Sequence, residues 1–176
     1  MIILQLFLEE TVKKNLYNLS KRVVDSAKSK NLTISTAESF TGGYIAKSLT
    51  DVPGCSNVLV AGLVTYMIKA KEKFLNVKDE TISTHTVVSK EVVKEMALGA
   101  LNSTGSDISI ATTGYAGPGD DPETGKFFIG IAFNEGGATR TIYKEFFIDN
   151  TRDFIRVTAT KIALEKVYII INGGLI

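Results

Sequence analysis

Apolar and polar side chains alternate along this chain with the period of helices in some segments and of strands in others. In residues 9–29, 89–101 and 151–171, apolar positions recur every three or four residues, which predicts three long amphipathic helices. Ser89 is the expected N-cap of the second helix. The predicted inward positions are Val12, Leu16, Leu19, Val23, Val24 and Ala27, then Val92, Val93, Met96, Ala97, Ala100 and Leu101, and finally Phe154, Ile155, Ala159, Ile162, Ala163 and Val167.

Short runs of β-branched and apolar residues, bounded by glycine, proline and polar residues, predict five strands. The last two strands form a hairpin around Gly136 and Gly137. Short helices are expected over residues 43–50 and 67–71, and a loop is expected around His85. The five predicted strands are 32–36, 60–66, 107–113, 127–133 and 141–148.

Helices interspersed with strands predict an α/β fold. We expect a three-layer α/β/α sandwich around a mixed, mostly parallel sheet with an antiparallel hairpin at its edge. The 176 residues, 44% of them hydrophobic, are enough for one well-buried core and too few for two domains. The sequence therefore predicts a single domain over residues 1–176.

Charge and residue counts exclude several functional classes. The formal net charge is +1 and no dense Lys/Arg cluster is present, which argues against a nucleic-acid partner. Cys55 and His85 are the single cysteine and the single histidine, so neither a disulfide framework nor a zinc site of familiar spacing is expected. The absence of a disulfide framework favours a reducing compartment.

The apolar start of the chain looks like a packed terminus rather than a signal peptide, because acidic Glu9 and Glu10 follow it and no basic segment precedes it. No apolar run has the length of a membrane span. We therefore expect a cytoplasmic protein with no membrane partner. The apolar ends, residues 1–8 and 169–176, are candidate contacts of a homo-oligomer, although they could equally pack on their own core.

Ser39 lies where a predicted strand gives way to Thr41, Gly42, Gly43 and a helix. Free backbone N–H groups at a helix start attract anions, and glycines let a ligand approach the main chain. Such a turn suits a phosphate or a developing oxyanion. A serine before a helix is more often a plain N-cap, so the turn has two interpretations.

Two further strand ends carry polar side chains that would complete a site. Tyr66 is followed by Lys69 and Lys71, and Thr113 is followed by the glycine-rich segment 114–119. In open α/β sheets, ligands bind at such strand ends. A lysine could take a serine proton if burial lowers its pKa from ~10.4, and the sequence does not distinguish Lys69 from Lys71 for this role. Alternatively, both lysines are ordinary exposed helix residues.

A Ser-His-acid triad through His85 is a weaker alternative, since it depends on one histidine in an ordinary loop. Glu38 could orient the site or cap backbone groups of the turn. Asp120 and Asp121 are too few ligands for a cation site, so we expect no metal and no cofactor.

Arg152 and Arg156 lie one helical turn apart in the last predicted helix and could clamp a phosphate. One of them could instead pair with Asp149 or Asp153.

Six motifs occur in order along the chain and together resemble the CinA C-terminal domain family. This family includes stand-alone nicotinamide-nucleotide amidases (PncC) and the domain fused to competence/damage-inducible protein CinA. The resemblance runs from about residue 15 to about residue 168. It implies an α/β/α sandwich that hydrolyses the carboxamide of nicotinamide mononucleotide to nicotinate mononucleotide and ammonia. The motifs are Thr36-Ala-Glu-Ser-Phe-Thr-Gly-Gly43, Asp51-Val-Pro-Gly-Cys-Ser56, Val64-Thr-Tyr66 with Ala70-Lys71, His85-Thr-Val-Val-Ser89, Thr113-Gly-Tyr-Ala-Gly-Pro118, and Arg152-Asp153 with Arg156.

The resemblance also implies roles for individual residues. Ser39 matches the nucleophile, Lys71 matches the base, and Tyr66 matches the tyrosine that begins the lysine's motif and assists it. The mechanism then needs no metal. The residues expected to bind the small-molecule nucleotide substrate are Glu38, Thr41, Gly42, Gly43, Thr113, Gly114, Gly117, Arg152 and Arg156.

Three departures from the family pattern bear on activity. The family often has cysteine where Phe40 stands and Ser-Asn where Met67 and Ile68 stand. It also commonly has Lys-Pro-Val-Gly-Thr where this chain has residues 123–126. If Ser-Asn positions the substrate, its loss leaves an alternative: a non-catalytic nucleotide-binding domain without amidase turnover.

Overall fold

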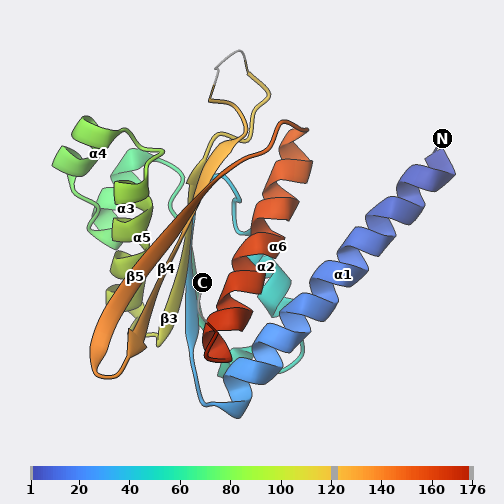
Figure 1. Cartoon of the computed structure of the whole chain (residues 1–176), viewed down its shortest axis with the longest axis horizontal. Coiled ribbons are helices and arrows are strands. Elements are labelled where there is room, and N and C mark those ends of the chain that lie inside the picture. The colour runs from blue at the N-terminus through green and yellow to red at the C-terminus, as the bar shows by residue number, and fades with distance from the viewer. Residues whose placement is uncertain (1, 120–122, 175–176) are drawn as a thin grey trace.

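The structure is a computed structural model that describes residues 2–119 and 123–174, with the side chains of residues 2–13 outside the description. Its helices surround a single five-stranded sheet (Figure 1). The helices are α1 (Ile2–Ser29), α2 (Tyr44–Thr50), α3 (Ile68–Leu75), α4 (Asp79–His85), α5 (Lys90–Thr104) and α6 (Arg152–Ile171), with a 3-10 turn, η1 (Cys55–Asn57). The strands are β1 (Ile34–Glu38), β2 (Leu59–Val64), β3 (Ile108–Gly114), β4 (Lys126–Glu135) and β5 (Ala138–Phe147).

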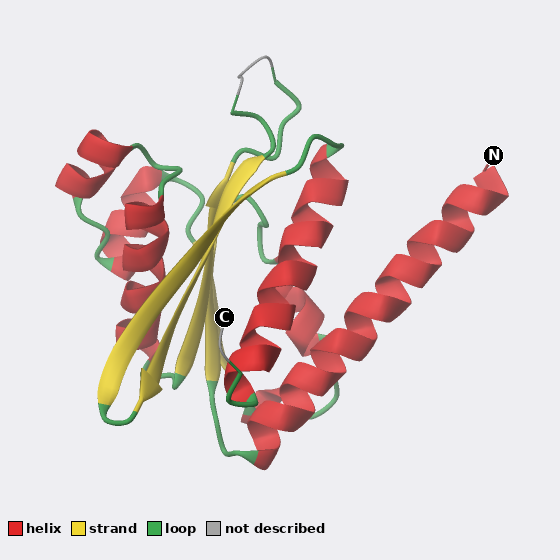
Figure 2. Ribbon diagram, in the orientation of Figure 1, coloured by secondary structure: helices red, strands yellow, loops and turns green. Residues whose placement is uncertain are grey.

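The sheet has the order β2-β1-β3-β4-β5. Strand β1 is parallel to both of its neighbours, whereas β4 is antiparallel to β3 and to β5. Figure 2 shows α1, α2 and α6 on one face of the sheet and α3, α4 and α5 on the other. The expected α/β/α sandwich with a mixed sheet and an antiparallel edge hairpin is confirmed.

Each face of the sheet has its own apolar core. One core joins the sheet to α1, α2 and α6, and the other lies beneath α5 and the neighbouring α3 and α4. Gly99 of α5 permits close packing here, because a Cβ at this position would clash with the Leu75 carbonyl at the end of α3. This contact fixes α3 close to α5.

The predicted helix faces are buried with few exceptions. Phe154 is 50% exposed, because it lies in the first turn of α6, at the end of the molecule where the strands terminate, and Ile162 is only partly buried. Val12 falls outside the described side chains. Ser89 caps α5 as predicted, since its hydroxyl accepts a hydrogen bond from the Val92 N–H group.

Several element boundaries differ from the prediction. Strand β1 begins at Ile34 rather than at residue 32, because the Thr33 N–H group donates to the Asp107 carboxylate, 2.8 Å away. His85 ends a short helix, α4, instead of lying in a loop. Helix α1 begins at Ile2 rather than at residue 9, and its first turns extend away from the sheet (Figure 1).

The β2–α3 connection carries one of the departures from the family pattern. Met67 is the N-cap of α3, with φ −84° and ψ 155°, and its side chain caps no backbone N–H group. It is 69% exposed. A serine at this position would therefore act as a helix cap.

We expect Met67→Ser to stabilise the protein by about 1 kcal/mol, because its hydroxyl can accept a hydrogen bond from the first turn of α3. This corresponds to a rise in Tm of roughly 2–4 °C for a domain of this size, measured by thermal unfolding. Ile68→Ser, one residue inside the helix and also exposed, is the matched control. An equal gain in both variants would contradict the capping role.

Candidate functional site

The C-terminal ends of the parallel strands β1, β2 and β3 lie side by side at one end of the sheet, and Ser39 lies there directly after β1. Its N–H group donates to the Thr112 carbonyl of β3 (3.1 Å), and its own carbonyl accepts from the Gly42 N–H group (3.0 Å). Lys71, in α3, reaches this turn from the other side. Its Nζ atom lies 2.9 Å from Ser39 Oγ.

The amine of Lys71 is completely buried. Burial lowers its pKa from 10.5 to about 8. Two backbone carbonyls after β2 accept hydrogen bonds from Nζ, that of Thr65 at 2.7 Å and that of Tyr66 at 3.1 Å. Lys69, by contrast, is exposed. Of the two candidate lysines, only Lys71 is hydrogen-bonded to the serine.

This geometry suits proton transfer from the serine to the lysine. A neutral amine has two N–H groups and one lone pair. If the carbonyls of Thr65 and Tyr66 accept the two N–H groups, the lone pair is directed at the Ser39 hydroxyl. The protonated amine fits the same site, because it can donate to all three oxygens.

Tyr66 contributes its main chain to this arrangement. Its hydroxyl accepts a hydrogen bond from Arg152 Nη2 at 2.9 Å, and its side chain is 56% exposed. Tyr66 therefore contacts Lys71 through its carbonyl oxygen, whereas its hydroxyl points to α6, and its assistance to the lysine stays a prediction. A side-chain pattern could not reveal this.

Glu38 is fully buried and caps α2 from the preceding strand. Its carboxylate accepts hydrogen bonds from three backbone N–H groups, those of Gly43 (3.0 Å), Ile45 (3.0 Å) and Ala46 (2.9 Å), and from the Thr36 hydroxyl (3.2 Å). The free helix N-terminus expected from the sequence is thus occupied by the protein's own carboxylate. Glu38 and these amides are a structural unit and do not face a ligand.

The turn after Ser39 is held by contacts with α6 and β3. Gly42 and Gly43 have positive φ angles of 62° and 92°, as glycine permits. A Cβ at Gly42 would lie 3.1 Å from Arg156 Nη2, which donates to the Thr41 carbonyl at 3.0 Å. The buried Thr41 hydroxyl shares a hydrogen bond with that of Thr112 (2.8 Å).

The segment after β3 is engaged in structural contacts as well. The Thr113 hydroxyl donates to the Val87 carbonyl (2.8 Å), so its proton is not available to a ligand. Gly114 pairs with Phe127, with which a Cβ would clash. The Gly117 carbonyl accepts from Arg152 Nη1 at 2.7 Å. Arg152 therefore joins this segment to Tyr66.

Neither Arg152 nor Arg156 forms an ion pair with a carboxylate of the described residues, so the proposed pairs with Asp149 or Asp153 are absent there. The two guanidinium groups bind different acceptors instead of converging on one point. Within the described chain, Nε of Arg156 is buried without a hydrogen-bond partner. Both cations keep donors for an anionic ligand.

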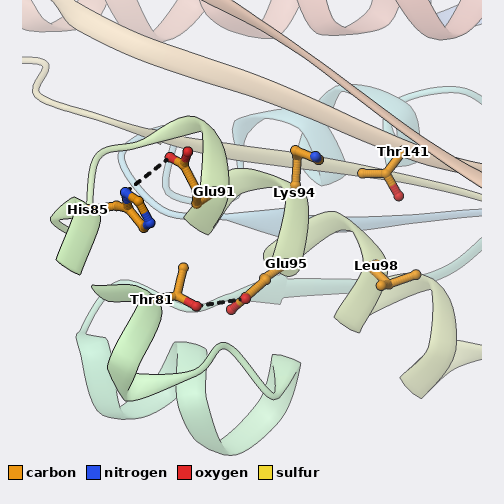
Figure 3. A pocket seen from close by; sticks show the side chains of 7 residues that line it. All are labelled: Thr81, His85, Glu91, Lys94, Glu95, Leu98 and Thr141. Carbon is orange, nitrogen blue, oxygen red and sulfur yellow. Dashed lines mark hydrogen bonds and ion pairs between the residues drawn. The ribbon is translucent and has the colours of Figure 1, made fainter. Parts of the chain in front are cut away.

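His85 belongs to a different part of the molecule. It lines a surface cavity of about 290 Å³ between α4, α5 and β5 (Figure 3), and its Nδ1 atom lies 3.9 Å from a Glu91 carboxylate oxygen. None of the hydrogen bonds of Ser39 to described residues involves this histidine. The Ser-His-acid alternative is not assembled in this structure.

Thr65 and Thr112 are two site residues that the sequence reasoning missed. Thr65 acts through its carbonyl, and in the described structure its buried hydroxyl has no partner. Thr112 holds the serine turn through both its carbonyl and its hydroxyl. The position of Thr65 directly before Tyr66 was only a weak indication of its role. Thr65 binds Lys71 through its backbone carbonyl, and any residue type has such a carbonyl.

The predictions about metals, membrane spans and the chain termini can be compared with the described residues only. No group of three or more His, Cys, Asp or Glu side chains among these residues could hold a metal ion, and Asp120 and Asp121 lie outside the description. None of the described helices combines the length and apolarity needed to cross a bilayer. Of the apolar termini, Ile171 is buried in its own core, whereas Ile169 is 40% exposed.

Comparisons with known proteins agree with the resemblance found in the sequence. The model of the CinA C-terminal domain matches residues 16–171. A CinA-like protein of Chloroherpeton thalassium is 41% identical over 159 residues, which are 89% of this chain and 38% of that protein. The chain thus spans well under half the length of this curated relative.

Two solved structures have the same fold over nearly their whole length. Competence/damage inducible protein CihA of Agrobacterium tumefaciens has a TM-score of 0.83 and 34% identity, covering 89% of this chain and 95% of that one. A CinA superfamily protein of Klebsiella pneumoniae has a TM-score of 0.80 and 30% identity, covering 90% and 98%. The chain belongs to the CinA C-terminal domain family.

Proposed function

We propose that this chain is a metal-independent amidohydrolase that uses Ser39 as nucleophile and Lys71 as base, and that it hydrolyses the carboxamide of nicotinamide mononucleotide. The main support for this type of reaction is the buried Lys71 amine, which lies 2.9 Å from Ser39 Oγ and has a pKa lowered to about 8. A base with a pKa near the working pH is the most effective. The substrate follows from the resemblance to the amidases of the family.

In the proposed acylation, neutral Lys71 takes the proton of the Ser39 hydroxyl while Oγ forms a bond to the amide carbon. The protonated lysine then gives that proton to the amide nitrogen, the C–N bond breaks, and ammonia leaves. In deacylation, Lys71 takes a proton from water, which attacks the ester. The proton returns to Ser39 as nicotinate mononucleotide is released.

The oxyanion needs hydrogen-bond donors beside Ser39. The N–H groups of Phe40 and Thr41 come directly after the serine, and no hydrogen bond to a described residue uses either of them. The amides at the start of α2 cannot serve, because Glu38 occupies them. We therefore assign the oxyanion contacts to Phe40 and Thr41.

The substrate's phosphate needs positive charge at the rim of the site. Arg152 and Arg156 supply it without a neutralising carboxylate among the described residues. Guanidinium groups suit phosphate because their N–H groups match its oxygen atoms. Of the two, Arg152 is the more exposed and is the better candidate for direct contact.

The non-catalytic alternative depended on the loss of Ser-Asn at positions 67 and 68. In this structure Met67 occupies the N-cap position of α3 without a side-chain cap and is exposed, and neither side chain is hydrogen-bonded to Ser39 or Lys71. The serine–lysine pair is intact with Met67 and Ile68 in these positions. This supports a catalytic domain over a binding module.

Ser39→Ala and Lys71→Met should each lower kcat for ammonia release from nicotinamide mononucleotide by about 10⁴-fold or more, because the two side chains act as a unit. Lys69→Met, which changes an exposed lysine two residues away, is the matched control and should keep most of the activity. Circular dichroism and thermal unfolding check that the variants fold. An inactive wild-type protein, assayed over a panel of carboxamides, would refute the amidase proposal, and nucleotide binding without turnover would select the alternative.

The pH dependence of kcat/KM reports the pKa of the catalytic base in the free enzyme. Only the neutral amine can accept the serine proton, so activity should rise about tenfold per pH unit below the lysine pKa and level off above about 8. Burial disfavours the protonated amine and lowers its pKa, so the rise ends near pH 8 instead of near the ordinary lysine value of 10.5. A profile that is flat between about pH 6.5 and 9 would contradict a lysine base.

Tyr66→Phe should leave kcat within about threefold of wild type while raising KM, because the variant keeps the carbonyl that binds Lys71 and loses only the hydroxyl that accepts from Arg152. Steady-state kinetics separate the two effects. A large fall in kcat with KM unchanged would show instead that the hydroxyl takes part in the chemistry.

A further inference from the structure

Among the described residues, Lys71 is the one side chain that is hydrogen-bonded to the Ser39 hydroxyl. Two other candidate bases are engaged elsewhere, because Glu38 accepts from the first backbone N–H groups of α2 and His85 lines a separate surface cavity. A serine mechanism has two halves, and each needs a base that accepts a proton from the attacking group. The described site therefore supplies the same amine for both halves.

This amine is held in one position. Lys71 Nζ donates to the carbonyls of Thr65 (2.7 Å) and Tyr66 (3.1 Å) and lies 2.9 Å from Ser39 Oγ. It gives a proton to the nitrogen that leaves in the first half and takes a proton from the molecule that enters in the second. Because Nζ is fixed, the entering molecule occupies the place that the leaving ammonia has vacated. A place that releases an amine is equally suited to accept one.

Burial limits the size of the entering molecule. Ser39 is 8% exposed and Lys71 is fully buried, so the reacting atoms lie below the surface. Helix α3, which carries Lys71, packs closely against α5, because a Cβ at Gly99 would clash with the Leu75 carbonyl. We expect these surroundings to admit an amine close to ammonia in size and to exclude one with a bulky substituent.

Charge selects among the small amines. The Glu38 carboxylate is fully buried and bonded to the N-terminal amides of α2, so it does not face an entering molecule. Lys71 is cationic when it is protonated, and the pyridinium ring of the proposed substrate places a positive charge directly beside the acyl carbon. Like charges repel most strongly where water is excluded. An ammonium ion is therefore disfavoured at this place, whereas an uncharged amine meets no such repulsion.

We propose that this chain is also an acyltransferase, which transfers the acyl group held on Ser39 to a small uncharged amine in competition with water. This activity rests on the amidase proposal, because it uses the same acyl-enzyme. The amine nitrogen forms a bond to the ester carbon, and the bond from that carbon to Ser39 Oγ breaks. Lys71 takes a proton from the nitrogen and returns it to Oγ, so the step balances without an oxidant or reductant.

Hydroxylamine tests the transfer, because it is small and largely uncharged near neutral pH. The full chain is incubated with nicotinamide mononucleotide and with hydroxylamine up to about 0.5 M at about pH 7.5, and ammonia release is followed in parallel. The transfer product is a hydroxamate, which is measured by its coloured iron(III) complex and by mass spectrometry. The ratio of hydroxamate to nicotinate mononucleotide should rise in proportion to the hydroxylamine concentration.

Two variants of the chain are the controls for this assay. Ser39→Ala should form neither product above the uncatalysed rate, because it cannot hold the acyl group. Lys69→Met changes an exposed lysine that is not hydrogen-bonded to the serine, and it should keep the wild-type product ratio. Circular dichroism checks that both variants fold.

The methyl ester of nicotinate mononucleotide tests the shared intermediate. Amide and ester pass through the same acyl-enzyme, so both should give the same ratio of hydroxamate to acid at a given hydroxylamine concentration. Unequal ratios would show that the amine attacks the substrate directly and would overturn the proposal.

Two further amines test the limits of size and charge. O-benzylhydroxylamine is uncharged but bulky, and it should give at least about tenfold less transfer than hydroxylamine at equal concentration. Methylammonium is small but charged, and it should slow ammonia release no more than sodium chloride does at the same concentration. Equal transfer to the bulky amine, or specific inhibition by methylammonium, would overturn the proposed selectivity for small uncharged amines.

The outcome also separates this proposal from the amidase proposal. Ammonia release without hydroxamate, over the whole range of hydroxylamine, overturns the transfer activity and leaves the amidase standing. The absence of both ammonia and hydroxamate in the wild-type protein overturns the two together.

Discussion

The amine of Lys71 can be buried in this protein because three oxygen atoms surround it: one from the Ser39 side chain and two from the main chain after β2. A buried amine without such partners would be costly. These oxygens come from the ends of two adjacent parallel strands, so the sheet order β2-β1 is a precondition of the site. The packing of α3 against α5 at Gly99 then holds the lysine in place.

Positive and negative groups are separated around this centre. Glu38, an acidic side chain next to the serine turn, accepts hydrogen bonds from the N-terminal amides of α2 and stabilises the turn. Arg152 and Arg156 are without carboxylate partners in the described structure and hold the turn and the segment after β3 through carbonyl contacts. The fold thus keeps its free positive charge at the rim, where an anionic substrate would bind.

Strand β2 is the edge strand of the sheet that lies next to the serine turn. Its inner side pairs with β1 and leads into the carbonyls that bind Lys71, whereas its outer side is uncharged and unpaired in the described chain. The opposite edge strand, β5, is charged and farther along the sheet from the serine turn.

The sequence by itself determined the helix faces, the hairpin, the mixed α/β architecture, the family, and the position of the Ser39 turn at a strand end. These depend on the local periodicity of side chains and on ordered motifs, which tertiary packing changed only at the ends of elements, as at Thr33 and Phe154. The tertiary structure alone decided that Lys71 and not Lys69 meets Ser39, 32 residues away in the chain. It also decided that Glu38 caps a helix and that Tyr66 and Thr65 act through carbonyl oxygens. The physical reason is that burial and backbone direction arise from contacts between distant segments, and every residue carries the same carbonyl whatever its side chain.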